Sequence, residues 1–161
     1  MQKITPCLWF DTEGEEAAQF YASIFPSSRI LETTRYGSAG PRAEGTVMTV
    51  LFELDGQRFV ALNGGPDFKP NEAISFQVDC ETQDEVDGFW TKLSEGGEQG
   101  PCGWLKDKFG ISWQIVPKVL TELISDPDQE KAQRVMAAML QMGKIEIAEL
   151  ERAAAGEEVN A

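Results

Sequence analysis

The sequence predicts an α+β fold in which two tandem βαβββ modules form a mixed sheet and are followed by C-terminal helices. Three observations lead to this prediction. The order strand, helix, further strands occurs twice; the hairpin dipeptide Asp55-Gly56 separates two strand-like runs; and the apolar spacing becomes helical from residue 119 onward. With 161 residues the chain has the length of one ordinary domain, which two such modules fill.

The first module begins with an apolar and aromatic run that ends at Asp11 and predicts a strand. The apolar residues from Ala18 to Phe25 then follow at helical spacing, and Pro26 ends the helix. Asp and Gly adopt positive φ readily, so the two runs that flank Asp55-Gly56 predict a β-hairpin. The expected elements are strands at residues 4–10, 29–36, 46–54 and 57–63 and a helix at residues 15–25.

The second module repeats this order after the loop at Gly64-Gly65-Pro66. Thr82 is a good N-cap residue for its helix, and Glu85 three positions later completes a capping-box pattern. Gly96-Gly97 ends the helix where positive φ is needed. The expected elements are a strand at residues 74–80, a helix at 83–95 and short strands around 102–105 and 112–116.

The C-terminal part of the chain is predicted to be helical. One helix starts near residue 119 and stops at Asp126-Pro127-Asp128, a second covers residues 129–142, and a third follows Gly143. The predicted division is a two-module domain at residues 1–118, a helical extension at 119–155 and a tail at 156–161. Within the domain, the modules cover about residues 1–66 and 72–118.

The charge balance limits the expected partners. The 27 Asp and Glu residues outnumber the 14 Lys and Arg residues, which gives a formal net charge of −13. Phosphates would be repelled, so neither a nucleic acid nor a membrane is an expected partner. The opening residues lack the apolar core of a secretory leader, and Cys7, Cys80 and Cys102 form no CxxC pair. We therefore expect a cytoplasmic protein with reduced thiols.

Histidine is absent from the chain. Imidazole is the commonest transition-metal ligand and the usual general base near neutral pH, so chemistries that require it are excluded. Any site must use carboxylates, amides, hydroxyls or thiols.

Six phrases along the chain carry a family resemblance. They are ITPCLWF at residues 4–10, AAQFY at 17–21, NGGP at 63–66, CGWLKD at 102–107, GISWQIVP at 110–117, and RVM at 134–136 with MGK at 142–144. Together they resemble the PhnB-like family labelled 3-demethylubiquinone-9 3-methyltransferase domain. That family belongs to the glyoxalase and bleomycin-resistance superfamily, also called the vicinal oxygen chelate superfamily. The resemblance implies a glyoxalase-like fold whose strands curl into a cup around a ligand cavity, commonly within a homodimer.

The resemblance also indicates where a metal would bind. In metal-dependent members of the superfamily the ligands are His or Glu, with occasional Gln, on the first and last strands of each module. Those positions hold Thr5 or Pro6, Leu62-Asn63, residues 73–75 and Gln114. Gln114 stands where a Glu ligand would lie, and its amide carries no charge, so a divalent ion would keep too few strong ligands. We predict no metal and no cofactor.

Four residues are expected to line the cup and bind a ligand: Asn63, Ser75, Trp104 and Gln114. Strand positions that face a cup interior supply orienting hydrogen bonds and apolar contacts. Each also has a structural interpretation, because a tryptophan such as Trp104 is often a core residue.

Cys102 is a candidate nucleophile, since it follows Pro101 in a loop that could face the cavity. Lys106 or Lys108 would stabilise its thiolate, but the chain offers no His as a base. The alternative is that Cys102 is a passive small residue.

Three functions agree with these observations. The first is metal-free binding of a small organic molecule in the cup. The alternative is a lyase, isomerase or transferase of the glyoxalase type, including the methyl transfer that the family label names. Against that transfer, no strand, glycine-rich turn and helix would offer amides to S-adenosylmethionine. A third function is protein binding through the Met-rich helix at residues 129–142, for which a homodimer is the simplest form.

Overall fold

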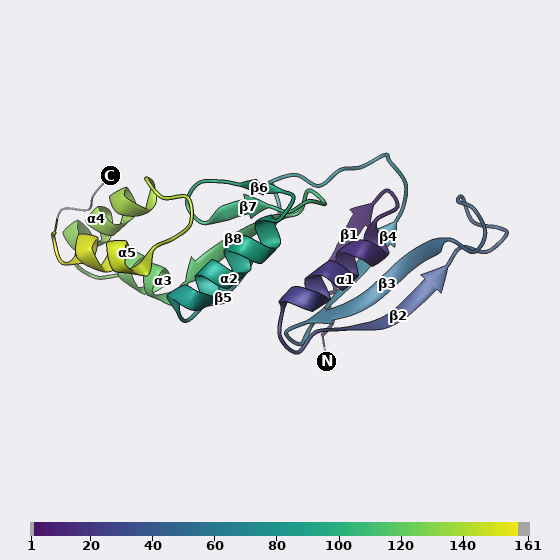
Figure 1. Ribbon diagram of the computed structural model, residues 1–161, viewed down its shortest axis with the longest axis horizontal. Helices are drawn as coiled ribbons and strands as arrows, with labels where there is room; N and C mark the ends of the chain where they lie inside the picture. Colours follow the sequence, from purple (N-terminus) through teal and green to yellow (C-terminus); the bar gives the residue numbers. More distant parts are fainter. Residues whose placement is uncertain (1, 158–161) are drawn as a thin grey trace. The chain divides into compact units, whose positions relative to one another are not determined.

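The computed structural model describes residues 2–157, and the chain divides into two compact units, Met1–Pro70 and Asn71–Ala161. Each unit contains one four-stranded mixed sheet with a helix against one face (Figure 1). The predicted α+β class and the repeated βαβββ order are confirmed. Over the described residues, no helix is both long enough and apolar enough to cross a lipid bilayer.

The first unit has the strand order β1-β4-β3-β2, in which β1 and β4 are parallel and the other pairs antiparallel. Asp55 and Gly56 have φ values of 46° and 81°, which close the predicted hairpin. The first strand starts at Cys7, later than predicted, because Pro6 has no N–H for the ladder. The elements are β1 (Cys7–Phe10), α1 (Gly14–Ile24), β2 (Arg29–Arg35), β3 (Val47–Leu54) and β4 (Gln57–Asn63).

The core of the first unit lies between α1 and the sheet. Ala17 and Ala18 are fully buried and let the helix approach β3 and β4 closely. The Tyr21 ring stacks on Phe52 with centroids 6.3 Å apart, and Phe52 stacks on Phe59 at 5.5 Å. Each large apolar side chain buried in this way contributes about 1.5–3 kcal/mol relative to exposure.

The second unit has the strand order β5-β8-β7-β6, with β5 and β8 parallel. The strand expected around residues 102–105 starts at Trp104, because Cys102 and Gly103 have φ values of 56° and 82°, outside the β region. Strand β6 was not predicted, since two polar residues show no alternation. The elements are β5 (Ser75–Cys80), α2 (Gln83–Ser94), β6 (Glu98–Gln99), β7 (Trp104–Lys106) and β8 (Ser112–Pro117).

The helix of the second unit starts as predicted. Thr82 is the N-cap, and its hydroxyl accepts a hydrogen bond from the Glu85 backbone N–H at 3.2 Å. The Glu85 carboxylate reaches back to the N–H of Glu81 instead of that of Thr82. The helix therefore has a side-chain cap within its own sequence.

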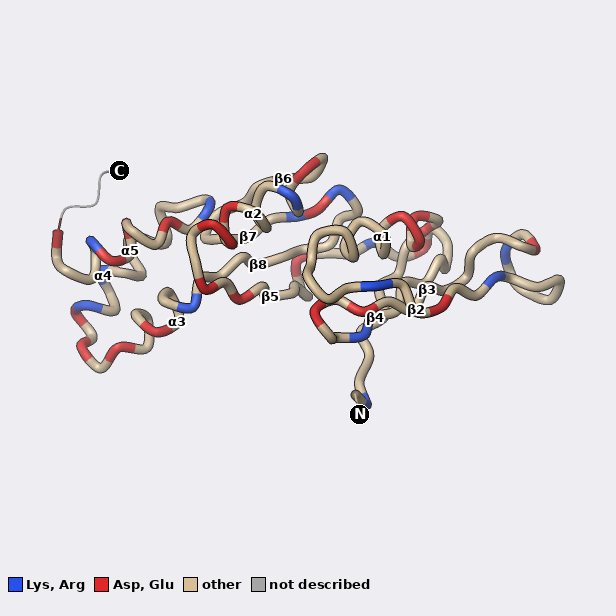
Figure 2. Tube along the Cα trace, turned by 60° about the horizontal axis from the view of Figure 1, so that its bottom comes forward, with Lys and Arg blue, Asp and Glu red and all other residues tan. Residues whose placement is uncertain are grey.

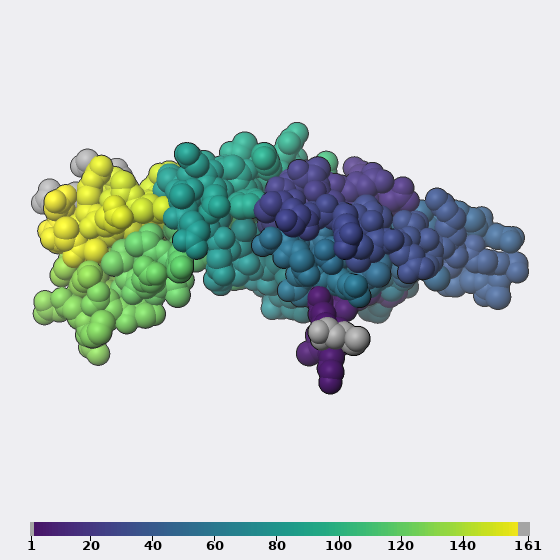
Figure 3. Space-filling model, turned by 90° about the horizontal axis from the view of Figure 1, so that it is seen from below, coloured from purple at the N-terminus to yellow at the C-terminus, as the bar shows by residue number. Residues whose placement is uncertain are grey.

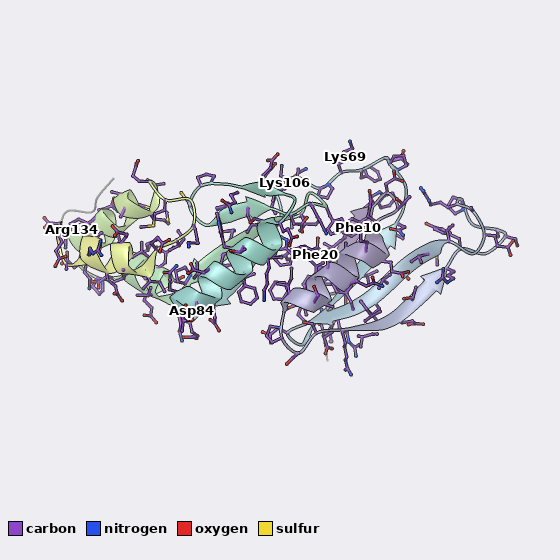
Figure 4. All side chains as sticks on the ribbon, in the orientation of Figure 1. Phe10, Phe20, Lys69, Asp84, Lys106 and Arg134 are labelled. Atoms are coloured by element: carbon purple, nitrogen blue, oxygen red, sulfur yellow. The ribbon has the colours of Figure 1, made fainter. Side chains whose placement is uncertain are left out.

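The C-terminal extension of the second unit consists of α3 (Lys118–Ile124), α4 (Gln129–Met139) and α5 (Ile147–Ala154). Figure 3 shows its green and yellow atoms as one continuous mass. Leu120, Val135, Ile145 and Leu150 form its buried core, and Met139 packs against this cluster. Arg134 (Figure 4) donates to the carbonyls of Ala153 and Ala154 and so satisfies the end of α5.

The extension differs from the sequence prediction in the end of its second helix, and part of the predicted tail lies outside the described residues. The helix expected at residues 129–142 ends at Met139, and Met139 belongs to the core of its own chain. The chain then turns through hydrogen bonds between Gln141 N–H and Ala138 O and between Met142 N–H and Met139 O. Of the predicted tail at residues 156–161, residues 158–161 lie outside the described part of the chain.

Candidate functional site

Three of the four predicted site residues lie together on one face of the second sheet. Gln114 on β8 is paired with Trp104 on β7, and its side-chain N–H donates to Ser75 Oγ on β5 at 2.9 Å. Successive side chains of a strand point to opposite faces. Trp113 and Ile115 therefore point the other way, where they are buried on the side that α2 covers.

A cavity of about 480 Å³ is lined by residues of this sheet face and of the loop that precedes β7. Trp104 and Pro101 provide apolar surface, and Cys102 lies in the same wall. Ser112 also lines the cavity, at the start of β8. Ser75 and Gln114 lie on the same sheet face but are not among these lining residues. Most of the lining surface is apolar, as is usual for a small-molecule site, although charged side chains also border it.

Ser112 is the polar residue of this site that the sequence interpretation missed. Its side chain is only 2% exposed, and within residues 2–157 its Oγ has no hydrogen-bond partner. A buried hydroxyl left unpaired costs about 1–3 kcal/mol. The signal was present in the sequence, because Ser112 lies two positions before Gln114 on the same strand and must share its face.

The charged residues at the cavity are two carboxylates and one ammonium group. Lys106 on β7 (Figure 4) forms an ion pair with Glu72, and Glu98 is a third charged residue of the lining. The hydrogen bond from Lys106 lowers the pKa of Glu72, and the same bond raises the pKa of Lys106. The cavity therefore carries one net negative charge. Acidic segments, red in Figure 2, are also frequent along the rest of both units.

Cys102 lines the cavity, as the sequence prediction required of a nucleophile. Its thiol is half-buried. The two cations expected to assist it have other contacts: Lys106 pairs with Glu72, and the Lys108 ammonium lies 5.4 Å from the centroid of the Phe109 ring. The geometry therefore places Cys102 in the wall and gives its thiol no identified activating group.

Asn63, the fourth predicted site residue, lies in the first unit at the end of β4. Its Oδ1 accepts from the Gly14 backbone N–H at 2.7 Å, and its Nδ2 donates to the Val47 carbonyl at 3.2 Å. Its backbone carbonyl accepts from the Tyr36 hydroxyl at 2.6 Å. The side chain thus connects the first turn of α1 to the sheet.

A second cavity, of about 560 Å³, lies in the first unit beside this turn of α1. Asn63 lines it together with Arg42, Glu13 and Glu16. Arg42 pairs with Asp11 at 3.4 Å, and both side chains are partly exposed. Its lining is more polar than that of the 480 Å³ cavity, and none of the other predicted site residues lines it.

The residues at the positions where metal-dependent members of the superfamily hold their ligands do not fit a metal ion. Ser75 and Gln114 offer a hydroxyl and an amide, and the amide N–H already donates to the hydroxyl. Across the described residues, no three His, Cys, Asp or Glu side chains come together in a way that could hold an ion. Divalent ions favour several charged or imidazole ligands, which this face lacks.

The paired βαβββ units and the cavity beside the second sheet define a glyoxalase-type domain. Solved structures agree with this class. The Mesorhizobium loti fosfomycin resistance protein FosX is 11% identical, with 78% of this chain and 100% of that one covered and a TM-score of 0.55. Protein PA1353 from Pseudomonas aeruginosa is 17% identical, with 73% and 98% covered and a TM-score of 0.61. At these identities the likeness concerns the fold alone.

The family follows from closer matches. The sequence model of the 3-demethylubiquinone-9 3-methyltransferase family matches residues 2–116. A PhnB protein from Bacillus cereus is 38% identical, with 72% of this chain and 99% of that chain covered and a TM-score of 0.65. No curated protein matches the chain. The chain therefore belongs to the PhnB-like 3-demethylubiquinone-9 3-methyltransferase family, as the six sequence phrases predicted.

Proposed function

We propose that this protein binds a small organic molecule, without a metal, in the 480 Å³ cavity of its second unit. The observation that carries the proposal is the Ser112 hydroxyl, which is buried and unpaired within the described residues at the wall of that cavity. A polar ligand group would offset the cost of leaving this hydroxyl without a partner, once rotation of the Ser112 side chain turns its buried Oγ toward the cavity. The partly exposed Trp104 ring in the same wall offers a flat apolar surface.

The lining supports a ligand with a planar apolar body, one hydrogen-bonding group and no negative charge. An aromatic ring packed on Trp104 would add about 0.5–1.5 kcal/mol beyond the area buried. Glu72 and Glu98 outnumber Lys106 at the cavity, so an anion would be repelled. Ser75 and Gln114 remain candidate contacts on the neighbouring strands. We assign Asn63 a structural role, because backbone groups occupy both atoms of its amide.

Three molecules with one ring system test this ligand class. We would titrate ¹⁵N-labelled protein with 2-naphthalenemethanol, 2-naphthylmethylamine and 2-naphthoic acid, which are neutral, cationic and anionic, and follow amide shifts by NMR. We expect the alcohol and the amine to shift the resonances of Trp104, Ser112 and Gln99, and the acid to bind at least about tenfold more weakly. Binding of the acid alone, or shifts confined to the first unit, would contradict the proposal.

Two substitutions test the named contacts. Ser112→Ala should lower the affinity for 2-naphthalenemethanol by roughly fivefold, because the ligand hydroxyl loses one hydrogen bond of about 1 kcal/mol. Trp104→Leu should weaken all three naphthalenes alike. Ser38→Ala, in an exposed loop of the first unit, is the matched control and should change nothing. If the Ser112→Ala variant and the wild type bound the alcohol with equal affinity, the Ser112 hydroxyl would not be a ligand contact.

Native mass spectrometry of protein purified without a chelator would test metal-free binding directly. The expected spectrum shows no stoichiometric divalent ion and shows a retained small organic mass. Stoichiometric metal would contradict the proposal and would favour a glyoxalase-type enzyme.

The family description supports a second candidate, methyl transfer. Another transferase, lyase or isomerase reaction of the glyoxalase type is the wider form of this alternative. In that case Cys102 is the candidate reacting group, since its thiol lines the cavity. Calorimetric titration with S-adenosylmethionine tests the methyl-transfer form, and micromolar binding would support it. Loss of turnover in Cys102→Ala, with unchanged binding of 2-naphthalenemethanol, would support a reaction at the thiol.

We also propose a homodimer. β1 and β5 are edge strands of their sheets, and an edge strand presents unpaired backbone groups to a further strand. Beside these edges, Ile4 and Ile74 are 84% and 75% exposed. Light scattering should give twice the 17.8 kDa chain mass, and Ile74→Glu should lower it. A monomer at tens of micromolar would contradict the dimer.

The compartment that we propose is the cytoplasm. Cys7, Cys80 and Cys102 are all free thiols, which suits a reducing environment. Cell fractionation with an antibody against the protein would test this, and recovery from an oxidising compartment would contradict it.

A further inference from the structure

The C-terminal extension lies outside the part of the chain that the family model matches. That match ends at residue 116, and α3 begins at Lys118. The extension has its own buried core, against which Val116 of β8 also packs. Its hydrogen bonds to the rest of the second unit come from the segment at residues 142–147, which joins α4 to α5. Helix α3 adds contacts with β8 and an ion pair between Lys118 and Glu81.

One side of this segment is hydrogen-bonded to Cys102 and Gly103, which we call the Cys102-Gly103 corner; its residue Cys102 lines the cavity. The Cys102 N–H donates to the Met142 carbonyl, and the Gly103 N–H donates to the Gly143 carbonyl, both at 2.8 Å. Cys102 has a φ of +56°, a conformation that costs a non-glycine residue roughly 1–2 kcal/mol. The turn is closed by its own hydrogen bond from the Trp104 N–H to the Pro101 carbonyl at 3.0 Å, and the extension adds two contacts from outside the turn.

Side-chain packing fixes the corner further. A Cβ added at Gly103 would lie 2.8 Å from the Ile115 carbonyl oxygen and 3.1 Å from Ile145 Cγ1. Gly103 is thus enclosed between β8 and the extension. Ile145 is fully buried, so this contact ties the corner to the core of the extension.

The other side of the segment is held by Gln83, the first residue of α2. The Gln83 Nε2 donates to the Ile145 carbonyl at 3.0 Å, and its Oε1 accepts from the Ile147 N–H at 2.8 Å. Lys144 adds an ion pair with Asp87 at 2.7 Å, one turn further along α2. The segment is therefore attached to α2 on one side and to the cavity wall on the other.

We infer that Gln83 and the segment at residues 142–147 position the Cys102-Gly103 corner and thereby set the shape of the ligand cavity. The inference rests on the proposed function for its ligand, and it makes Gln83 a positioning residue that does not touch the ligand. If the corner is released, only part of the population keeps a binding-competent wall, and apparent affinity falls by that fraction.

The Cys102 thiol reports on the corner without any ligand. We would measure its reaction with 4,4′-dithiodipyridine in full-length protein with Cys7→Ser, which removes the exposed thiol. Cys80 is buried, and burial raises the pKa of its thiol to about 12, so it should stay silent. Gln83→Ala should speed the reaction of Cys102 severalfold, whereas Gln133→Ala, at an exposed position of α4, should not.

The matching binding experiment uses 2-naphthalenemethanol. Gln83→Ala should lower the affinity for this alcohol by about tenfold, and Gln133→Ala should leave the affinity unchanged. Ile147→Pro is a second variant: it removes the single N–H that Gln83 accepts, at the first helical position, where proline is tolerated. It should reproduce both effects more weakly, and it keeps the test valid if Gln83→Ala does not fold.

The outcomes separate this inference from the proposed function. If no naphthalene binds the wild type, the ligand proposal fails, while the thiol rates still decide whether Gln83 holds the corner. If Gln83→Ala and Ile147→Pro lower the melting temperature yet leave the Cys102 rate and the affinity at wild-type values, the extension is only a stabilising addition. That result would overturn the inference.

Discussion

The two units fold the same βαβββ order but use their polar side chains differently. In the first unit α1 has no side-chain cap, and Asn63 from β4 satisfies the N–H of Gly14 at its start. In the second unit Thr82 caps α2 from within the sequence. Gln83 is therefore free to hold the C-terminal extension. The comparison teaches that a helix with its own cap releases neighbouring polar groups for long-range contacts.

The two sheets also differ in their buried polar side chains. Each has one buried polar side chain with several hydrogen bonds, Asn63 in the first and Asp107 in the second. Only the second sheet also carries Ser112, which is buried and unpaired among the described residues. The buried polar side chain of the first sheet, Asn63, therefore stabilises the fold, whereas the second sheet also has Ser112 beside a cavity.

The largest expected effect concerns Asp107. Its Oδ1 accepts from the N–H groups of Phe109 and Ile111, and its Oδ2 accepts from Trp113 Nε1 at 2.9 Å. Asp107→Ala leaves these donors without their acceptor and should lower the free energy of unfolding of the second unit by about 3–4 kcal/mol. Urea unfolding followed by tryptophan fluorescence measures this. Asp79→Ala, at an exposed carboxylate of β5, is the control, and equal losses in the two variants would contradict the anchor role.

The next effect concerns Asn63 and should appear in the first unit. Asn63→Ala removes the acceptor of the Gly14 N–H and the donor to the Val47 carbonyl. We expect a loss of about 2–3 kcal/mol in the free energy of unfolding, with hydrogen exchange accelerated in α1. Asn71→Ala, whose side chain makes only a local contact with Ala73, should cost far less. Faster hydrogen exchange in α2 instead of α1 would contradict the prediction that Asn63 stabilises only the helix of its own unit.

Local patterns predicted much of this molecule. The Asp55-Gly56 hairpin and the Thr82 cap depend on neighbours in sequence, and both are confirmed. The shared face of Ser75, Trp104 and Gln114 followed from strand alternation once the fold was expected. The same alternation would have included Ser112, but whether a hydroxyl is left unpaired depends on surroundings that no local pattern contains.

Contacts between distant segments were beyond the sequence. Asn63 and Gly14 are 49 positions apart, and Gln83 and Ile147 are 64 apart. Asn63 was predicted as a ligand contact because its strand position matched the cup, and nothing in the sequence showed that backbone groups would take up its amide. The sequence likewise did not show that the partly buried Met139 side chain packs against the core of its own extension.

A smaller effect separates two serines on paired strands of the second sheet. Ser75 and Ser112 are register partners, yet only Ser75 Oγ accepts a hydrogen bond, from Gln114. Ser75→Ala should lower the free energy of unfolding by about 1 kcal/mol, whereas Ser112→Ala should change it by less than about 0.5 kcal/mol or raise it. Thermal unfolding of both variants tests the order. A larger loss for Ser112→Ala would mean that its hydroxyl has a partner in solution and would weaken the ligand proposal.

The smallest effect is the pH dependence of the Asp87–Lys144 pair, which joins α2 to the extension. The hydrogen bond from Lys144 is the main cause that lowers the pKa of Asp87 below its usual 3.8. A lowered folded-state pKa means that the stabilisation is complete above the unfolded value and is lost as the pH falls through the folded one. Because both side chains are partly exposed, the effect on stability should stay below about 1 kcal/mol.

Asp87→Asn should therefore flatten the loss of stability below about pH 4. Gln83 Nε2 also donates to Asp87 Oδ1, so acid should loosen the contact that holds the Cys102 corner. Because the thiolate fraction falls with pH in both proteins, the informative quantity is the ratio of the Cys102 rate in the wild type to that in Asp87→Asn, which should rise between pH 4 and pH 3. Asp126, whose pKa Lys131 lowers in the same way, is the matched control. Asp126→Asn should change the acid limb of stability but not the thiol rate, because Asp126 lies away from the segment at residues 142–147 in sequence and pairs only within the extension.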